Sequence, residues 1–148
     1  MSEAQIINYG LRPVGTVRII EDDFVVELID SNIATQSRCI YAFLVRDVVI
    51  RVGSSQKPLR VRMRQWERDV SRALKGLRSP CRAEEAMIWR EVLSDKYGRV
   101  FARMGVVAST PLGELDIFQV EEAALITKFQ PRLCWDKNRH KNGQTPSF

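Results

Sequence analysis

Three side chains that lie far apart in the sequence have the chemistry needed for metal-assisted cleavage of a phosphodiester. Tyr41 lies in an apolar run, Arg62 in a basic amphipathic segment, and Glu122 in an otherwise apolar helical face. A phenol can relay a proton from an attacking water, a guanidinium can clamp a phosphate, and a carboxylate can hold a divalent cation. Such chemistry requires the three side chains to meet in the folded chain.

Glu122 is informative because a charge within an apolar face is unfavourable without a partner. Phe118, Leu125 and Ile126 lie three or four positions away and therefore on the same side of a helix. Two partners remain open, an arginine in a salt bridge or a divalent cation such as magnesium, which binds one or two carboxylates and keeps its waters. Glu121 points about 100° round the helix and could simply be solvated.

Tyr41 and Arg62 each have an ordinary structural role as well as a chemical one. Alternation along a strand sends Tyr41 and Phe43 to one face, where a buried tyrosine most often packs and makes one hydrogen bond. Arg62 falls beside the apolar stripe of the next helix, so its guanidinium should reach out from the edge of the packed face. For the outer arginines, solubility and contact with nucleic acid are equally good interpretations; these are Arg60, Arg64 and Arg68.

Positive charge is concentrated in one part of the chain. The net charge is +5, yet residues 57–82 contain nine lysines and arginines against two acids, a local excess of seven. A surplus of this kind suits a polyanion such as DNA or RNA. A solvated basic helix is the alternative interpretation.

Length and composition indicate one globular domain. The chain has 148 residues and is 45% apolar, which is ordinary for a folded protein and argues against disorder. It contains no apolar run near the ~20 residues that span a bilayer, and its first residues lack a signal-peptide pattern. We therefore expect a cytoplasmic protein that does not bind membranes.

The cysteines and the histidine leave little for zinc chemistry. Cys39, Cys81 and Cys134 are widely spaced, and His140 is the one histidine in the sequence. We expect reduced thiols, no zinc site and no imidazole base.

Hydrophobic patterns predict two β-hairpins followed by three helices. The hairpins cover residues 14–29 and 40–52, and the second has nearly continuous apolar strands, as expected when both faces are covered. Pro58 suits the first turn of a helix whose stripe repeats at helical spacing, with Leu59, Met63, Trp66, Val70 and Ala73. The remaining elements are a helix over 82–94, an extended run over 100–108 and a helix over 116–129.

These residues together resemble the GIY-YIG nuclease superfamily. Where the family has a Gly-Ile-Tyr strand, residues 39–41 read Cys-Ile-Tyr, and where it has Tyr-Ile-Gly, residues 51–53 read Arg-Val-Gly. The leucine and arginine of the family's helix match Leu59 and Arg62. The family's glutamate, aliphatic pair and proline match Glu122, residues 125–126 and Pro131, with a cysteine where an asparagine would fall. The resemblance covers about two thirds of the chain.

The resemblance implies an α+β fold with a small three-stranded antiparallel sheet flanked by helices. It places the nuclease domain at residues 38–135, with an N-terminal hairpin extension over 1–37 and a basic flexible tail over 136–148.

The resemblance also implies the reaction, which is single-metal hydrolysis of DNA, with RNA as another possible substrate and a homodimer as a possible assembly. Glu122 would hold Mg²⁺ or Mn²⁺, Tyr41 would activate water, and Arg62 would stabilise charge in the transition state. Contacts to nucleic acid are expected from Gly53, Ser54, Lys57, Arg60, Arg64 and Arg68.

Three positions depart from the family pattern. Arg51 replaces the second tyrosine; it could hold a phosphate or make Tyr41 easier to deprotonate. Trp66 stands where the family often has histidine or tyrosine, and Cys134 replaces a bracing asparagine, a role that Asp136 or Asn138 could take over. Two other functions therefore stay open: a catalytically degenerate nucleic-acid-binding module, and a protein-interaction domain with an acidic partner.

Overall fold

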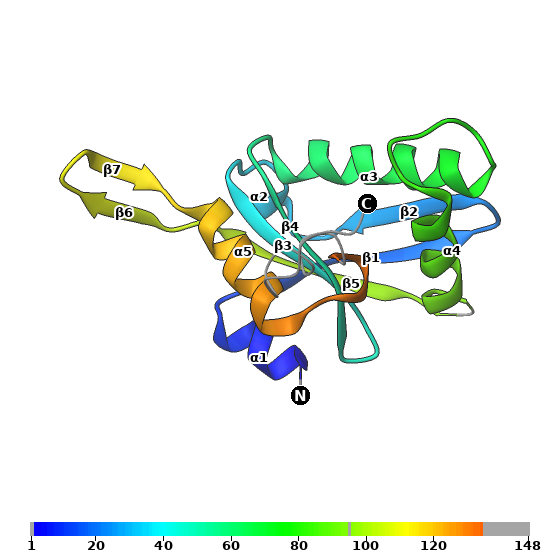
Figure 1. Cartoon of the computed structure of the whole chain (residues 1–148), viewed down its shortest axis with the longest axis horizontal. Coiled ribbons are helices and arrows are strands. Elements are labelled where there is room, and N and C mark those ends of the chain that lie inside the picture. Colours follow the sequence, from blue (N-terminus) through cyan, green and yellow to red (C-terminus); the bar gives the residue numbers. More distant parts are fainter. Residues whose placement is uncertain (1, 95, 135–148) are drawn as a thin grey trace, which may run out of the picture.

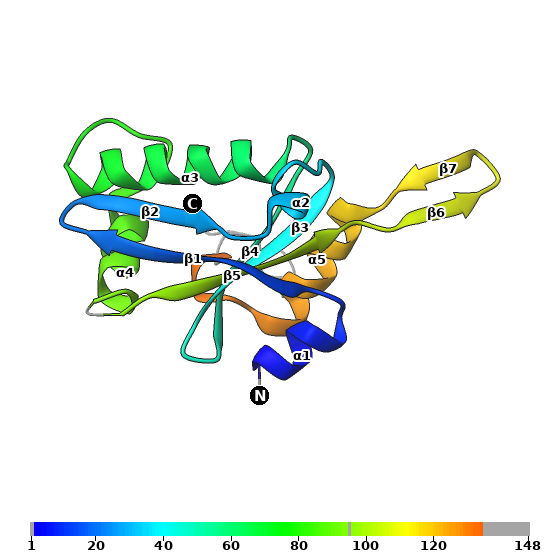
Figure 2. The same cartoon turned by 180° about the vertical axis from the view of Figure 1, so that it is seen from behind.

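One five-stranded antiparallel sheet runs through the protein in the order β2-β1-β5-β3-β4 (Figure 1). The computed structural model describes residues 2–94 and 96–134. A separate two-stranded hairpin projects from one end of the body (Figure 2). The strands are β1 Arg12–Ile20, β2 Asp23–Leu28, β3 Cys39–Val45, β4 Val48–Ser55, β5 Gly98–Met104, β6 Val107–Thr110 and β7 Gly113–Asp116.

Both predicted hairpins form with the expected partners. Arg46 and Asp47 connect β3 to β4 with φ values of 50° and 66°, the left-handed backbone that a tight two-residue turn requires. β5 lies between the two hairpins, because it pairs with β1 on one side and β3 on the other. The predicted α+β class with an antiparallel sheet is confirmed, and the N-terminal hairpin extends that sheet from three strands to five.

Helices cover both faces of this sheet. α3 and α4 pack on one face and α1 and α5 on the other, while α2 is a single short turn between the hairpins. The bounds are α1 Ser2–Asn8, α2 Ser31–Ala34, α3 Leu59–Leu74, α4 Ala83–Val92 and α5 Phe118–Phe129, followed by the short 3₁₀ helix η1, Arg132–Cys134.

Strand alternation divides the core as the sequence predicts. Tyr41 and Phe43 belong to the cluster beneath α3 and α4, and Ile40 and Ala42 to the cluster beneath α5. Every residue of β3 is buried, which agrees with its continuous apolar sequence. β3 is therefore covered on both faces of the sheet.

α3 is positioned by its apolar stripe and by the open edge of β2. Four of the five stripe residues are fully buried, and Ala73 is half-buried. The Val26 N–H donates to Glu67 Oε2 and the Phe24 N–H to Ser71 Oγ, each at 2.9 Å. The helix thus satisfies backbone donors that an edge strand would otherwise leave exposed.

Some local predictions were wrong. The predicted strand over 100–108 is interrupted, because β5 ends at Met104 and the chain continues into the projecting β6–β7 hairpin. Gly105 packs against Phe118 so closely that a Cβ would lie 2.4 Å from the Phe118 Cβ. α1 was not predicted, since its seven residues are too few for a clear period. The predicted tail over 136–148 lies outside the described residues.

The described part of the chain contains no helix that is both long enough and apolar enough to cross a membrane.

Gly53 makes room for the ring of Tyr41. The two residues are opposite each other in the β3–β4 ladder, and a Cβ on Gly53 would lie 2.5 Å from both Cζ and the hydroxyl oxygen of Tyr41. Atoms do not approach that closely, so the phenol can lie across β4 only because position 53 has no side chain.

We expect Gly53→Ala to destabilise the protein by about 1–3 kcal/mol, the range for overpacking a core. In a Tyr41→Leu background, which lacks Cζ and the hydroxyl, the same substitution should cost much less. Urea denaturation of the four proteins of this double-mutant cycle measures the coupling. An equal loss in both backgrounds would contradict the proposed contact.

Candidate active site

The Tyr41 hydroxyl is the point where β3 and α3 meet. It accepts a hydrogen bond from Trp66 Nε1 at 2.7 Å and one from Arg62 Nε at 3.1 Å. Arg62 and Trp66 are four residues apart and so lie on the same side of α3. The Tyr41 side chain is fully buried, which means that both donors shield it from solvent. The predicted meeting of Tyr41 with Arg62 therefore occurs.

Two of the three departures from the family pattern contact each other. The Arg51 guanidinium lies 5.1 Å from the centre of the Trp66 ring, and the Arg62 guanidinium lies 5.5 Å from it. Such cation–π contacts are favourable, and they strengthen as the site loses water. Arg51 and Trp66 thus form one packed unit with Arg62.

Arg51 is held by groups that sequence reasoning missed. Its Nη1 donates to the Leu133 carbonyl and lies 3.7 Å from Glu85 Oε1 at the start of α4. Its Nε is buried and has no hydrogen-bond partner within residues 2–94 and 96–134. A buried donor without a partner is destabilising by about 1–3 kcal/mol, so Arg51 is only partly satisfied.

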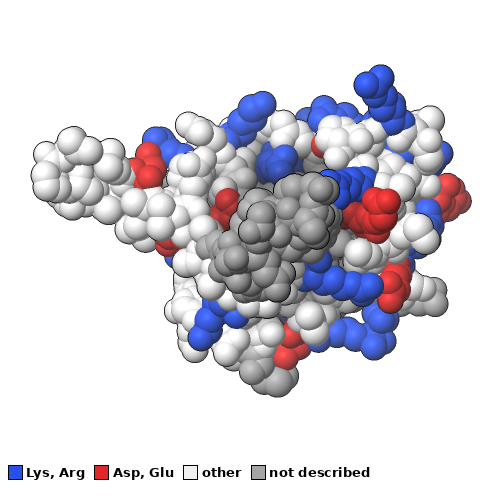
Figure 3. Space-filling model, in the orientation of Figure 1, with Lys and Arg blue, Asp and Glu red and all other residues white. Residues whose placement is uncertain are grey.

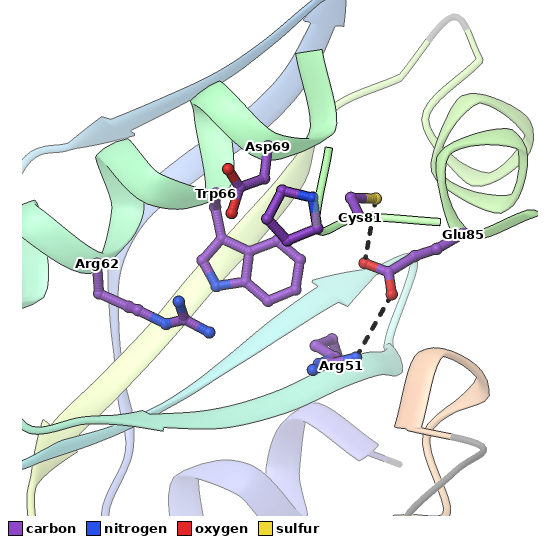
Figure 4. Close-up of a pocket in the computed structure, with 7 residues that line it drawn as sticks. Arg51, Arg62, Trp66, Asp69, Cys81 and Glu85 are labelled. Carbon is purple, nitrogen blue, oxygen red and sulfur yellow. Dashed lines mark hydrogen bonds and ion pairs between the residues drawn. The ribbon is translucent and has the colours of Figure 1, made fainter. Parts of the chain in front are cut away.

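A cavity of about 200 Å³ opens beside this cluster, between α3, the start of α4 and β4 (Figure 4). Its charged walls carry two guanidiniums and two carboxylates. The lining residues are Arg51, Arg62, Trp66, Asp69, Pro80, Cys81 and Glu85.

Cys81 contributes a neutral group to this cavity. Burial, with a further contribution from the neighbouring Glu85 carboxylate, raises the pKa of the Cys81 thiol to about 12. The thiol therefore stays protonated at neutral pH and is a poor nucleophile. Burial also raises the pKa of Cys39, to about 11. All three cysteines are free, in agreement with the predicted reduced thiols.

Glu122 reaches β4 from the opposite face of the sheet. Phe118, Leu125 and Ile126 around it are buried as predicted, and the Ser54 hydroxyl donates to Glu122 Oε1 at 2.8 Å. Ser54 directly follows Gly53, so Tyr41 and Glu122 contact adjacent residues of one strand from its two sides. The structure brings Tyr41, Arg51 and Arg62 together. Glu122, on α5, contacts β4 one residue beyond Gly53 and does not line the cavity.

Glu121 corrects one expectation. Instead of being solvated, it forms an ion pair with Arg103, and it accepts the Val106 N–H at 2.8 Å. This carboxylate is a structural link between α5 and the end of β5.

Cys134 braces β4 through its thiol. The sulfur lies 3.5 Å from both the N–H and the carbonyl oxygen of Val52, as acceptor for one and donor to the other. The thiol at the position of the family's asparagine thus attaches η1 to the outer strand. Asp136 and Asn138, considered as substitutes, lie outside the described residues.

The predicted basic surface lies along the outer side of α3 (Figure 3). Lys57, Arg60 and Arg64 are exposed and make no ion pair within the described part of the chain, whereas Arg68 is exposed but paired with Asp69 at 2.9 Å. Gly53 is buried under Tyr41 and Ser54 binds Glu122, so a role for these two in binding nucleic acid stays a prediction.

The residues around Glu122 fit a cation that retains most of its waters. Among the described residues, no group of three or more acidic, histidine or cysteine side chains is placed to hold a metal ion. One half-buried carboxylate beside a hydroxyl is the kind of oxygen ligand set from which Mg²⁺ or Mn²⁺ can reach a phosphate.

The chain matches no protein-family model and no curated protein sequence. Among solved structures it is similar to a mutant of bacteriophage T4 EndoII, with a TM-score of 0.62 and 18% identity over 88% of this chain and 96% of that one. It is also similar to restriction endonuclease HPY188I in complex with product DNA, with a TM-score of 0.53 and 14% identity over 92% of this chain and 80% of that one. At these identities the likeness shows a shared fold.

Proposed function

We propose that this protein is a divalent-metal-dependent DNA endonuclease of the GIY-YIG type that hydrolyses phosphodiesters by a single-metal mechanism. Its fold is similar to that of a restriction endonuclease bound to product DNA, which supports DNA as the substrate. The observation that carries the proposal is the hydrogen bond from Arg62 to the buried Tyr41 hydroxyl. It joins the family's tyrosine and arginine, from distant segments, into one site.

In this arrangement the Tyr41 hydroxyl has no open position at which to take a proton from water. A phenol oxygen accepts two hydrogen bonds, and both are made, by Arg62 and Trp66. When Arg62 moves onto a phosphate, one acceptor position of Tyr41 becomes free for the attacking water. Tyr41 would take a proton from that water while its own hydroxyl proton passes to a phosphate oxygen, so that the phenol relays the proton and stays neutral. Binding of the phosphate and activation of the water would thereby be coupled through one side chain.

Glu122 and Arg62 would act on the phosphate from the two sides of β4. This strand is at the edge of the sheet and ends at Ser55, so a nucleic-acid strand lying across its end can contact α3 and α5 together. Ser54 orients the Glu122 carboxylate by donating to it. A magnesium or manganese ion held by Glu122 would supply Lewis-acid stabilisation of the leaving oxygen.

One other function has support from the geometry. A nucleic-acid-binding module without catalysis fits the complete burial of Tyr41 and the place of Glu122 on the opposite face. It would bind DNA through the same basic surface and leave it intact.

Nicking of supercoiled plasmid in Mg²⁺ separates the two functions. We expect nicking by the wild type and a loss of roughly 10²-fold or more in Glu122→Ala, because the carboxylate that holds the cation is removed. Bound Mn²⁺, measured by electron paramagnetic resonance, should be lost as well. Glu114→Ala, at an exposed site on β7, is the matched control. Salt-sensitive binding without nicking by the wild type would favour the binding module.

Tyr41→Phe and Arg62→Lys test the coupling between the two residues. Each should lower the nicking rate by roughly 10²-fold or more, and the double variant should be little worse than either alone, since both remove the same step. Single-turnover rates measure this, with Arg18→Lys, at an exposed position of β1, as the control. Losses that simply add would contradict a shared role.

The basic surface makes a separate prediction. Replacing Lys57, Arg60 and Arg64 together with glutamine should weaken DNA binding and reduce the slope of log K against log salt by roughly two to three, or about 0.9 for each phosphate contact. Fluorescence anisotropy at several salt concentrations measures the slope. An unchanged slope would show that DNA binds elsewhere.

A further inference from the structure

The cavity beside Arg62 is continuous with the proposed phosphate site. Arg62 donates to Tyr41 through Nε and also forms part of the cavity wall. A group bound in the cavity would therefore be adjacent to a phosphate held by Arg62. The identity of that group can be inferred from the walls.

A simple anion does not fit these walls. Arg51 and Arg62 are accompanied by two carboxylates, Asp69 and Glu85, so a second phosphate would meet repulsion as well as attraction. Trp66 and Pro80 add apolar surface to the lining. The lining suits a ligand with an apolar body whose edges carry both hydrogen-bond donors and acceptors.

The size of the cavity limits that ligand to a small ring system. Its volume of about 200 Å³ is below the ~300–1,000 Å³ of pockets for drug-sized molecules. A single nucleobase is flat, has donors and acceptors on its edges, and is attached to the phosphate that Arg62 would hold.

The polar groups of the cavity have hydrogen-bonding capacity to spare. Glu85 Oε1 is 3.7 Å from Arg51 Nη1, which is too long for a hydrogen bond, and Glu85 Oε2 accepts a weak bond from the Cys81 thiol at 3.7 Å. Arg51 Nε has no hydrogen-bond partner among the described residues. Within the described chain, the Asp69 carboxylate accepts one hydrogen bond, at Oδ1 from Arg68 Nε. Carboxylates can therefore accept from a base while Arg51 donates to it.

We propose that the cavity binds one unpaired nucleobase bearing an exocyclic amino group, beside the scissile phosphate; this rests on the proposed function. Asp69 and Glu85 accept from the amino group, as carboxylates do from cytosine. Thymine presents its O4 carbonyl oxygen where cytosine has the amino group, so an acceptor would face the carboxylate acceptors. Extrusion of a paired base opposes binding, so a base that is already unpaired is preferred.

Duplexes with one bulged nucleotide test this in Ca²⁺, which replaces Mg²⁺ so that binding is measured without cleavage. We expect a duplex with a bulged dC to bind roughly tenfold more tightly than one with a bulged dT or a bulged abasic site. Glu85→Gln and Asp69→Asn should each reduce the preference for dC over dT, because a carboxamide also donates to carbonyl oxygens. Affinity for the abasic duplex should stay unchanged in both variants.

Glu84→Gln is the matched control, since Glu84 is exposed on the same turn of α4 and does not line the cavity. Equal affinity of the wild type for the three bulged duplexes, with plasmid nicking intact, overturns the base site and leaves the proposed function standing. A preference that survives in both carboxylate variants also overturns it. Failure to bind or nick any DNA overturns both proposals.

Discussion

The site depends on a single buried oxygen, the hydroxyl of Tyr41. A phenol deep in a core is favourable only if its polar end is satisfied, and here two side chains of α3 donate to it. The same bonds fix where α3 lies above β3 and where Arg62 points. Gly53 is also required for this position of the hydroxyl, because a side chain at residue 53 would displace the Tyr41 ring. Packing and the candidate chemistry thus share one set of contacts.

The departures from the family pattern form local units of their own. Arg51 packs on the Trp66 ring, and its guanidinium lies near Glu85 and the Leu133 carbonyl of η1. The Cys134 thiol hydrogen-bonds to both the backbone N–H and the carbonyl of Val52. An arginine at position 51 needs acceptors, and the Leu133 carbonyl accepts from it while the Glu85 carboxylate lies 3.7 Å away. Arg51 and Trp66 line the cavity, and the contact between Tyr41 and Arg62 is present beside them.

Periodicity explains how much of this could be predicted. The strands around Tyr41 and the stripe of α3 have clear patterns, so their existence and the faces they bury follow from the sequence. The break at Gly105 depends on contact with Phe118, which no local pattern reveals. The meeting of Tyr41 with Arg62 followed from burying the α3 stripe on β3. The approach of Glu85 to Arg51 depends on where the loop after α3 places α4. No local sequence pattern reveals that position.

The position of Glu122 limits the kind of ligand that can contact it and Tyr41 at the same time. It contacts Ser54 from one face of the sheet while Tyr41 lies against Gly53 on the other, so no ligand confined to one face can reach both. A substrate that uses both must cross the end of β4, where the edge strand has no further neighbour and the exposed Lys57 follows. A long flexible polyanion can follow such a path over an edge, with Arg60 and Arg64 along α3 to neutralise its next phosphates. The topology thereby favours a nucleic-acid strand over a compact ligand as the molecule that would bring these side chains together in the proposed reaction.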